Sequence, residues 1–223
     1  MSRGRRLTRV KSKPLHPAAQ RSFLDWDAKA LLREPAAFPK LTSPELFGNR
    51  NPLDVEIGSG SGEYLLWLAS QDPQANFLGI EVSRRTAMQA ANLAAEGRLA
   101  NVRILRADFK LLTPLLAAEG WRRAFLHFPD PVHKRKDEKR SLVNQAFLDM
   151  MASTLISGGE LSIASDKVDF LMQMLELAEG DARFEKAHSE RYLEGLEAPV
   201  KSRFQRFWER KGVQPLRFVL RRL

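Results

Sequence analysis

Short apolar runs alternate along this chain with longer segments in which apolar residues recur every three or four positions. The first run, LDVEI at 53–57, is typical of a buried strand, and EYLLWLAS at 63–70 has the spacing of an amphipathic helix. The same reasoning predicts further strands at 76–81, 101–108, 122–128 and 160–166, helices at 83–97, 141–156 and 167–180, and a last pair of strands at 183–190 and 215–223. Gly97 is expected to cap the C-terminus of the helix at 83–97.

This alternation of strands and helices predicts an α/β fold of the Rossmann-like kind. Its central sheet is expected to be mostly parallel, with helices on both faces and a C-terminal antiparallel strand pair. We expect one domain at 23–223, beginning with short helical pieces at 23–48, and a basic flexible arm at 1–22. In such sheets, ligands bind outside the carboxyl ends of the strands.

The composition indicates the cellular compartment of the protein and whether it is expected to bind a metal. Hydrophobic residues make up 43% and charged residues 28% of 223, and no apolar run approaches the roughly 20 residues of a membrane span. The start, MSRGRRLTRVKSKP, lacks the apolar stretch of a secretory signal. The chain has no cysteine, which excludes disulfides, disfavours structural zinc and fits the cytoplasm. The four histidines have no metal-ligand spacing, so we expect no metal site.

The charge is strongly positive and unevenly distributed. The formal net charge is +9, which favours a polyanionic partner, although a generally basic surface without a partner is the alternative. Three patches carry most of the excess: Arg3–Arg21, Lys134–Arg140 and Lys201–Arg222. Their separation around a nearly neutral segment indicates an RNA-binding face.

A glycine-rich turn follows the first strand and stands between carboxylates. Gly58 and Gly60 allow a ligand to approach the backbone, but several nucleotide-binding families share this spacing. Glu56 precedes the turn and Glu63 follows it, which disfavours a pyrophosphate. The sulfonium and ammonium groups of S-adenosylmethionine would suit these acids.

Two more acids end the next strands. Glu81 lies where a carboxylate can accept both hydroxyls of a ribose, and Asp108 lies where one can accept from an adenine amino group. The alternative is that such residues only cap the following helices. Three acids at successive strand ends beside a glycine turn favour the cofactor site.

A stiff loop follows the fourth strand. Asp130 stands between Pro129 and Pro131, which restrict the backbone, and a basic run comes next. A rigid loop presents a carboxylate at little cost in entropy. A plain rigid turn is the alternative, and the basic neighbours favour a functional loop.

Five motifs now carry a family resemblance. EIGSGSGE at 56–63, GIE at 79–81, RAD at 106–108, HFPDP at 127–131 and SGGELSIASD at 157–166 closely resemble, in this order, the bacterial tRNA (guanine-N7)-methyltransferase family. The resemblance runs from about Leu53 to the C-terminus, and the FPDP loop with its basic run is its most specific element. The glycine motif alone would indicate a class I methyltransferase.

The resemblance implies S-adenosylmethionine as cofactor, N7 of a tRNA guanine as methyl acceptor, and a role for each matching position. Asp130 would be catalytic and would also lie against the cofactor. The cofactor-binding residues would be Glu56, Gly58, Gly60, Glu81, Asp108 and Asp130, and the substrate-binding residues Lys134, Asp166, Ser202 and Gln205. Another RNA base, a small molecule, or RNA binding without catalysis remain alternatives, and the sequence does not give the oligomeric state.

The chain departs from the family pattern at several positions. His127 replaces a usual asparagine, Val132 a tryptophan and Gln205 a glutamate, and the basic run KRKDEKR lacks a usual histidine. An amide at Gln205 offers one acceptor oxygen where a carboxylate offers two, which bears on guanine selectivity. His127 stands at a strand end beside Asp130, where it could orient the base, but we favour a hydrogen-bonded histidine of the loop without a functional role.

Overall fold

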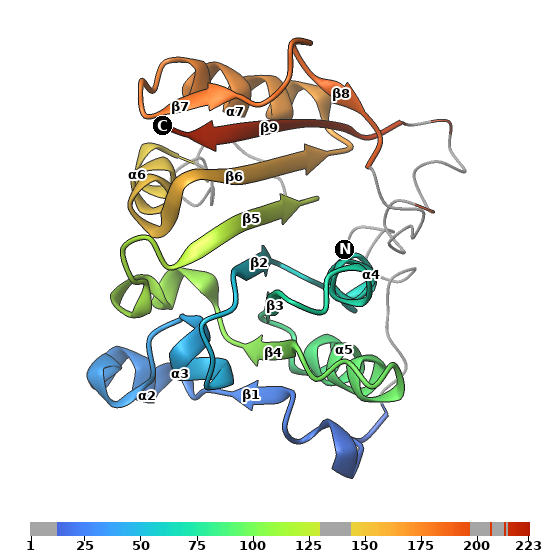
Figure 1. The fold of residues 1–223 in the computed structure, drawn as a ribbon. Helices are drawn as coiled ribbons and strands as arrows, with labels where there is room; N and C mark the ends of the chain where they lie inside the picture. The colour runs from blue at the N-terminus through green and yellow to red at the C-terminus, as the bar shows by residue number, and fades with distance from the viewer. Residues whose placement is uncertain (1–12, 130–143, 197–205, 207–211, 213) are drawn as a thin grey trace.

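The computed structural model describes residues 13–129, 144–196, 206, 212 and 214–223. Its centre is one nine-stranded sheet in the order β1-β4-β3-β2-β5-β6-β9-β7, with β8 beside β9. Figure 1 shows this sheet from its β7 end at the top to β1 at the bottom, with a pronounced twist. The α/β, Rossmann-like architecture predicted from the sequence is confirmed.

The strands and helices have the following bounds. The strands are β1 (Phe23–Asp25), β2 (Leu53–Ile57), β3 (Asn76–Glu81), β4 (Val102–Arg106), β5 (Trp121–His127), β6 (Leu155–Ser165), β7 (Phe184–Lys186), β8 (Leu193–Glu194) and β9 (Leu216–Arg222). The helices are η1 (Pro17–Ala19), α2 (Ala28–Arg33), η2 (Pro35–Ala37), α3 (Ser43–Phe47), α4 (Glu63–Gln71), α5 (Arg84–Glu96), η3 (Phe109–Leu111), η4 (Thr113–Leu115), α6 (Gln145–Thr154) and α7 (Val168–Glu179).

The direction of the strand order reverses between β2 and β5. Strands β1 to β6 all pair with one another in parallel, whereas β9 is antiparallel to both β6 and β7. From β2 the chain builds outward through β3 to β4, and it then returns to the other side of β2 to form β5 and β6. Such a reversal opens a crevice at the carboxyl ends of the two central strands, where ligands of open α/β sheets bind.

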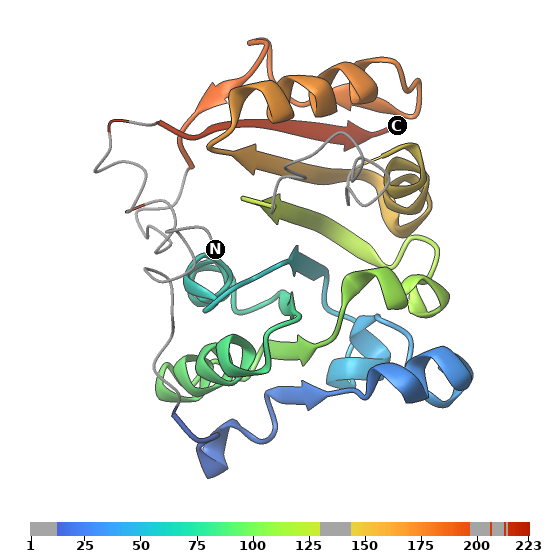
Figure 2. The ribbon, with the colours of Figure 1, turned by 180° about the vertical axis from the view of Figure 1, so that it is seen from behind.

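Apolar side chains pack on both faces of the sheet. On one face, Leu65 and Phe77 belong to a core formed with α4 and α5. On the other face, Val55, Trp121 and Phe147 belong to a core that also includes α6 and α7. Figure 1 and the reverse view in Figure 2 show α4 and α5 on one side and α2, α3 and α6 on the other. Residues of β3, β4 and β5 contribute to both cores, as expected for strands that are buried on both faces.

The structure corrects several boundaries. Phe23–Asp25 is a strand paired with β4 rather than part of the expected helical pieces, and β8 was not predicted. The helix expected at 141–156 ends at Thr154, because β6 already begins at Leu155 and continues through Gly158. Gly97 caps α5 with right-handed φ, and the left-handed conformation falls on Arg98 (φ 55°). Residues 141–143 lie outside the described part.

Residues 13–22 are held against α5, although they were predicted to belong to a flexible arm. Asn92 of α5 accepts a hydrogen bond from the backbone N–H of His16 (2.8 Å) and donates one to the carbonyl of Pro14 (2.9 Å). Ala19 of η1 is fully buried in the core beside α5. The part of the arm that contains most of its basic residues, 1–12, lies outside the described residues.

A buried carboxylate joins β2 to β5 near the amino ends of these strands. Asp54 is fully buried and accepts hydrogen bonds from Arg122 Nε (2.9 Å) and Arg123 Nε (2.9 Å). Arg122 also bridges to Asp72, which follows α4. Because Asp54 has two cationic partners, its burial is compensated.

No helix in the described part of the chain has the length and apolar character needed to cross a membrane.

We predict that Asp54→Asn lowers the free energy of unfolding by about 3 kcal/mol, because it breaks a buried ion pair. This value is at the lower end of the usual cost, since the two arginines are partly exposed and can turn toward solvent. Urea denaturation measures this change. The control is Glu176→Gln, which removes an exposed ion pair with Arg191 and is expected to cost less than about 0.5 kcal/mol. Equal losses in the two variants would contradict the structural role of Asp54.

Candidate cofactor and base-binding site

The glycine turn lies at the crevice between β2 and β5. Gly58, Gly60 and Gly62 have φ of 77°, 56° and 81°, a left-handed region that side chains with a Cβ rarely adopt. The backbone N–H groups of Gly58 and Ser59 both donate to the carbonyl of Ile80 on the neighbouring strand β3. The turn therefore folds back over the end of β3 and presents bare backbone to the crevice.

Glu81 fastens this turn to the segment after β3. One carboxylate oxygen accepts from the N–H of Gly60 (3.0 Å), and the other accepts from the N–H of Ser83 (2.7 Å). Both distances are those of good hydrogen bonds to a charged acceptor. A carboxylate has about four lone-pair sites, so Glu81 retains acceptor capacity for ribose hydroxyls. The sequence did not indicate its second role as the clamp of the glycine turn.

Glu56 is buried beneath the turn. Its side chain is on the α4 face of β2, and its Oε2 atom has no hydrogen-bond partner in the described part of the chain. Burial, followed by repulsion from Glu63, raises the pKa of Glu56 well above its ordinary value of 4.5; Glu81 adds to the shift and the Leu65 N–H opposes it. A cationic ligand would lower the pKa of Glu56 again, because it would supply the missing partner and favour the ionised carboxylate.

Two other acids that were predicted to belong to the site, Asp108 and Asp166, lie at the same edge of the sheet. Asp108 follows β4, is exposed, and accepts from the N–H of Lys110 as the cap of η3 (3.0 Å). The structure thus shows the helix-capping role that was the alternative for Asp108. Only one of its two carboxylate oxygens takes part in this capping bond. Asp166 follows β6 and is half-buried, and burial raises the pKa of its carboxyl group.

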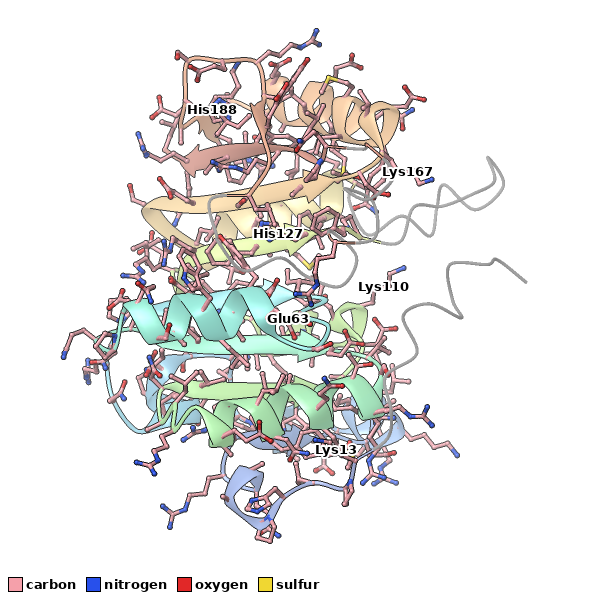
Figure 3. All side chains as sticks on the ribbon, turned by 90° about the vertical axis from the view of Figure 1, so that its right-hand side faces the viewer. Lys13, Glu63, Lys110, His127, Lys167 and His188 are labelled. Atoms are coloured by element: carbon pink, nitrogen blue, oxygen red, sulfur yellow. The ribbon has the colours of Figure 1, made fainter. Side chains whose placement is uncertain are left out.

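His127 is on β5 rather than in the loop, and it is buried. Its Nε2 lies 3.1 Å from the hydroxyl of Ser162 on β6, but its Nδ1 has no partner among the described residues. The ring contacts Tyr64 edge-on, with centroids 4.7 Å apart. The predicted strand at 122–128 is therefore confirmed as far as His127, whereas the expectation of a fully hydrogen-bonded histidine holds for one of its two ring nitrogens. Figure 3 shows labelled His127 and Glu63 in one region of the molecule.

Two glycines that were not singled out in the sequence are needed for close packing. A Cβ on Gly62 would meet Ala90 of α5 at 3.1 Å, and one on Gly79 would meet the hydroxyl of Ser59 at 2.8 Å. The Ser59 hydroxyl is itself buried and has no hydrogen-bond partner within the described part of the chain. The alternating glycines of GSGSG could have indicated the close approach at Gly62. The close approach at Gly79 depends on the register of β2 and β3, which the sequence does not show.

Several predicted site residues lie outside the described residues: Asp130, Lys134, Ser202 and Gln205. The same holds for the whole Lys134–Arg140 patch. At the C-terminal patch, Arg221 forms ion pairs with Glu160 and Glu185, and Arg222 pairs with Glu119. Those two arginines are thus engaged within the fold. No group of three or more metal-ligating side chains was found within the described ranges.

We predict that Glu56→Gln stabilises the ligand-free protein at neutral pH by about 1–3 kcal/mol, because an uncharged amide replaces a buried carboxylate that Glu63 repels. The folded-state pKa is raised, so the ionisation of Glu56 destabilises the fold as pH rises above about 4.5, its ordinary value. The advantage of the variant should therefore shrink as pH falls toward 4. Urea denaturation at pH 4 and pH 7.5 measures it; a variant less stable than wild type at both pH values would contradict the assignment.

Comparison with known proteins agrees with this geometry. Residues 50–217 match the model of a family described as putative methyltransferase. The chain is 43% identical, over 97% of both sequences, to the tRNA (guanine-N(7)-)-methyltransferase of Rubrobacter xylanophilus. It is 36% identical to the enzyme of that name from Chloroherpeton thalassium, over 98% of this chain and 97% of that one.

Solved structures show the same fold at lower identity. The 16S rRNA methyltransferase KamB superposes with a TM-score of 0.60 at 18% identity, over 78% of this chain and 89% of that one. TrmN from Thermus thermophilus gives a TM-score of 0.55 at 23% identity, over 88% of this chain and 48% of that one. These two likenesses concern the fold alone. The family match and the long, similar relatives show that this chain belongs to the tRNA (guanine-N(7)-)-methyltransferase family.

Proposed function

We propose that this chain is a cytoplasmic enzyme that transfers a methyl group from S-adenosylmethionine to N7 of a guanine in tRNA. The observation that carries the proposal is the buried Glu56 carboxylate, whose free oxygen lies beneath a glycine turn at the β2–β5 reversal. Family membership supplies the reaction and the RNA substrate. The absence of cysteine fits a reducing compartment.

The described residues suit this cofactor. Glu56 and Glu63 provide negative charge for its sulfonium and ammonium groups, and the bare turn from Gly58 to Gly60 allows close approach. Glu81 keeps acceptor sites for the ribose, and Asp108 has an oxygen for the adenine amino group. When bound, S-adenosylmethionine supplies an electrophilic methyl group carried by a positively charged sulfur.

The protein's task in this reaction is alignment. Guanine N7 has an exposed lone pair, so no residue has to remove a proton before attack. Transfer leaves positive charge on the purine, and a carboxylate beside it would stabilise that charge. We assign this electrostatic role to Asp130, in the loop that follows β5, rather than the role of a general base.

Cations around the same sheet edge would bind RNA phosphates. Lys110 and Lys167 follow β4 and β6, are exposed, and extend from one side of the view in Figure 3. We propose that they act with the three basic patches predicted from the sequence, and that Lys134, Asp166, Ser202 and Gln205 contact the target nucleotide. Such binding should weaken with added salt as counterions are released.

The decisive test is transfer of a labelled methyl group from S-adenosylmethionine to bulk tRNA, followed by digestion and nucleoside analysis. We expect label in 7-methylguanosine. Label in another nucleoside would favour a methyltransferase with a different RNA base as substrate. A cofactor-dependent rise in melting temperature without transfer to any RNA would favour an RNA-binding protein that has lost catalysis.

We predict that Glu81→Ala weakens S-adenosylmethionine binding by about 1–3 kcal/mol, because the ribose contacts and the clamp on Gly60 are lost together. Isothermal titration calorimetry measures the affinity. Glu34→Gln, at an exposed acid far along the chain from the turn, is the control and should bind like wild type. Unchanged affinity in Glu81→Ala would remove Glu81 from the cofactor site.

We predict that Asp130→Ala lowers the rate of methyl transfer far more than it lowers affinity for the cofactor, since its proposed partner is the charge that develops on the base. Single-turnover transfer and calorimetry on the same preparation separate the two effects. Equal losses in both would give Asp130 a purely structural role.

A further inference from the structure

The imidazole Nδ1 atom of His127, at the end of β5, has no role assigned to it in the proposed cofactor site. His127 is 8% exposed, and its Nδ1 atom has no hydrogen-bond partner among the residues that the structure describes. Its strand neighbours β2 across the reversal of strand order, and its side chain is on the same sheet face as Glu56, since Phe125, two residues earlier, is paired with Glu56. A buried polar atom without a partner costs about 1–3 kcal/mol, so its retention calls for a ligand.

The surroundings of His127 define what that ligand can be. The imidazole contacts the rings of Tyr64 and Phe125 edge-on, with centroids 4.7 and 5.7 Å away, so its immediate surroundings are aromatic. Burial, and secondarily the charge of Arg217, lowers the pKa of His127 to about 3, so the ring is neutral. A neutral imidazole has one N–H donor and one acceptor nitrogen.

The contact with Ser162 fits either tautomer of the neutral ring, because a hydroxyl both donates and accepts, and we take the tautomer with the proton on Nε2. With the proton on Nε2, the ring donates to the Ser162 hydroxyl at 3.1 Å and leaves the Nδ1 lone pair as the open acceptor. The nearby positive charge of Arg217 favours a lone pair over a second N–H. The site therefore offers a hydrogen-bond acceptor beside aromatic surface, which suits a planar group that carries N–H donors.

We propose that His127 is a base-binding residue whose Nδ1 accepts a hydrogen bond from the N1–H or N2–H of the target guanine. This inference rests on the proposed function. Guanine carries both N–H donors on the edge opposite N7, so a base held there presents N7 away from His127. Adenine has no hydrogen at N1, so an acceptor at this position also contributes to the choice of purine.

Side-chain geometry provides a matched set of variants. The amide oxygen of asparagine can stand where Nδ1 stands, whereas glutamine places its amide near the position of Nε2. His127→Phe keeps a ring against Tyr64 but has no polar atom. We expect His127→Asn to keep kcat/KM for tRNA within about threefold of wild type, and His127→Gln and His127→Phe to lose about tenfold or more.

Three measurements on the full chain test the inference: kcat/KM for tRNA, calorimetric affinity for S-adenosylmethionine, and melting temperature. Cofactor affinity should stay within about threefold of wild type in all three variants, because Nδ1 is assigned to the base. A loss in cofactor affinity that parallels the loss in transfer would overturn the assignment. So would a rescue by glutamine rather than asparagine, or equal activity in all variants.

The outcome also separates this inference from the proposed function. An active wild type whose three variants rank by melting temperature alone, with asparagine no better than phenylalanine, would show His127 to be structural while the methyltransferase stands. A wild type that binds cofactor but methylates no tRNA would end both, because no guanine would then be bound.

Discussion

The two hydrogen bonds of Glu81 are the contact on which the site depends. They tie Gly60 of the turn after β2 to Ser83 at the start of α5, and thereby join the ends of two neighbouring parallel strands. With the turn closed in this way, Glu56 lies beneath it, away from water, and its charge is costly without a cation. A carboxylate that is poorly stabilised in the free protein can gain more from a cationic ligand than one that is already hydrated or paired.

The sequence predicted the parts of the fold that have a strong repeating pattern. The central strand β3 (Asn76–Glu81) has an uninterrupted apolar middle, β4 (Val102–Arg106) is mostly apolar, and the long helices have clear periodicity. Strand β1 has only three residues and no pattern of its own, because its hydrogen bonds to β4 define it. The end of α6 was misplaced because Leu155 and Ile156 continue the apolar pattern of the helix, while pairing with β5 makes them extended.

The site was predictable to the same extent and for a related reason. Acids that end successive parallel strands must gather at one edge of the sheet, so Glu56, Glu81 and Asp108 could be placed there from the sequence. The group formed by Tyr64, His127 and Ser162 could not, because it depends on strand order and on the register between β5 and β6. The sequence placed His127 at the end of a predicted strand, and only the sheet shows that its side chain is buried.

The two edges of the sheet differ in how their buried polar atoms are satisfied. At the amino edge, Asp54 is bonded to two arginines, and the amide of Asn76 donates to Ser43 and Asn49. At the carboxyl edge, Glu56 Oε2, Ser59 Oγ and His127 Nδ1 have no partner within the described residues. On the amino side, Thr154 Oγ1, just before β6, is likewise buried without a partner among the described residues, but it is a single neutral hydroxyl, whereas the carboxyl edge gathers a carboxylate, a hydroxyl and an imidazole. The imbalance is explained if a ligand with positive charge and N–H donors completes the carboxyl edge, and S-adenosylmethionine together with guanine has both features.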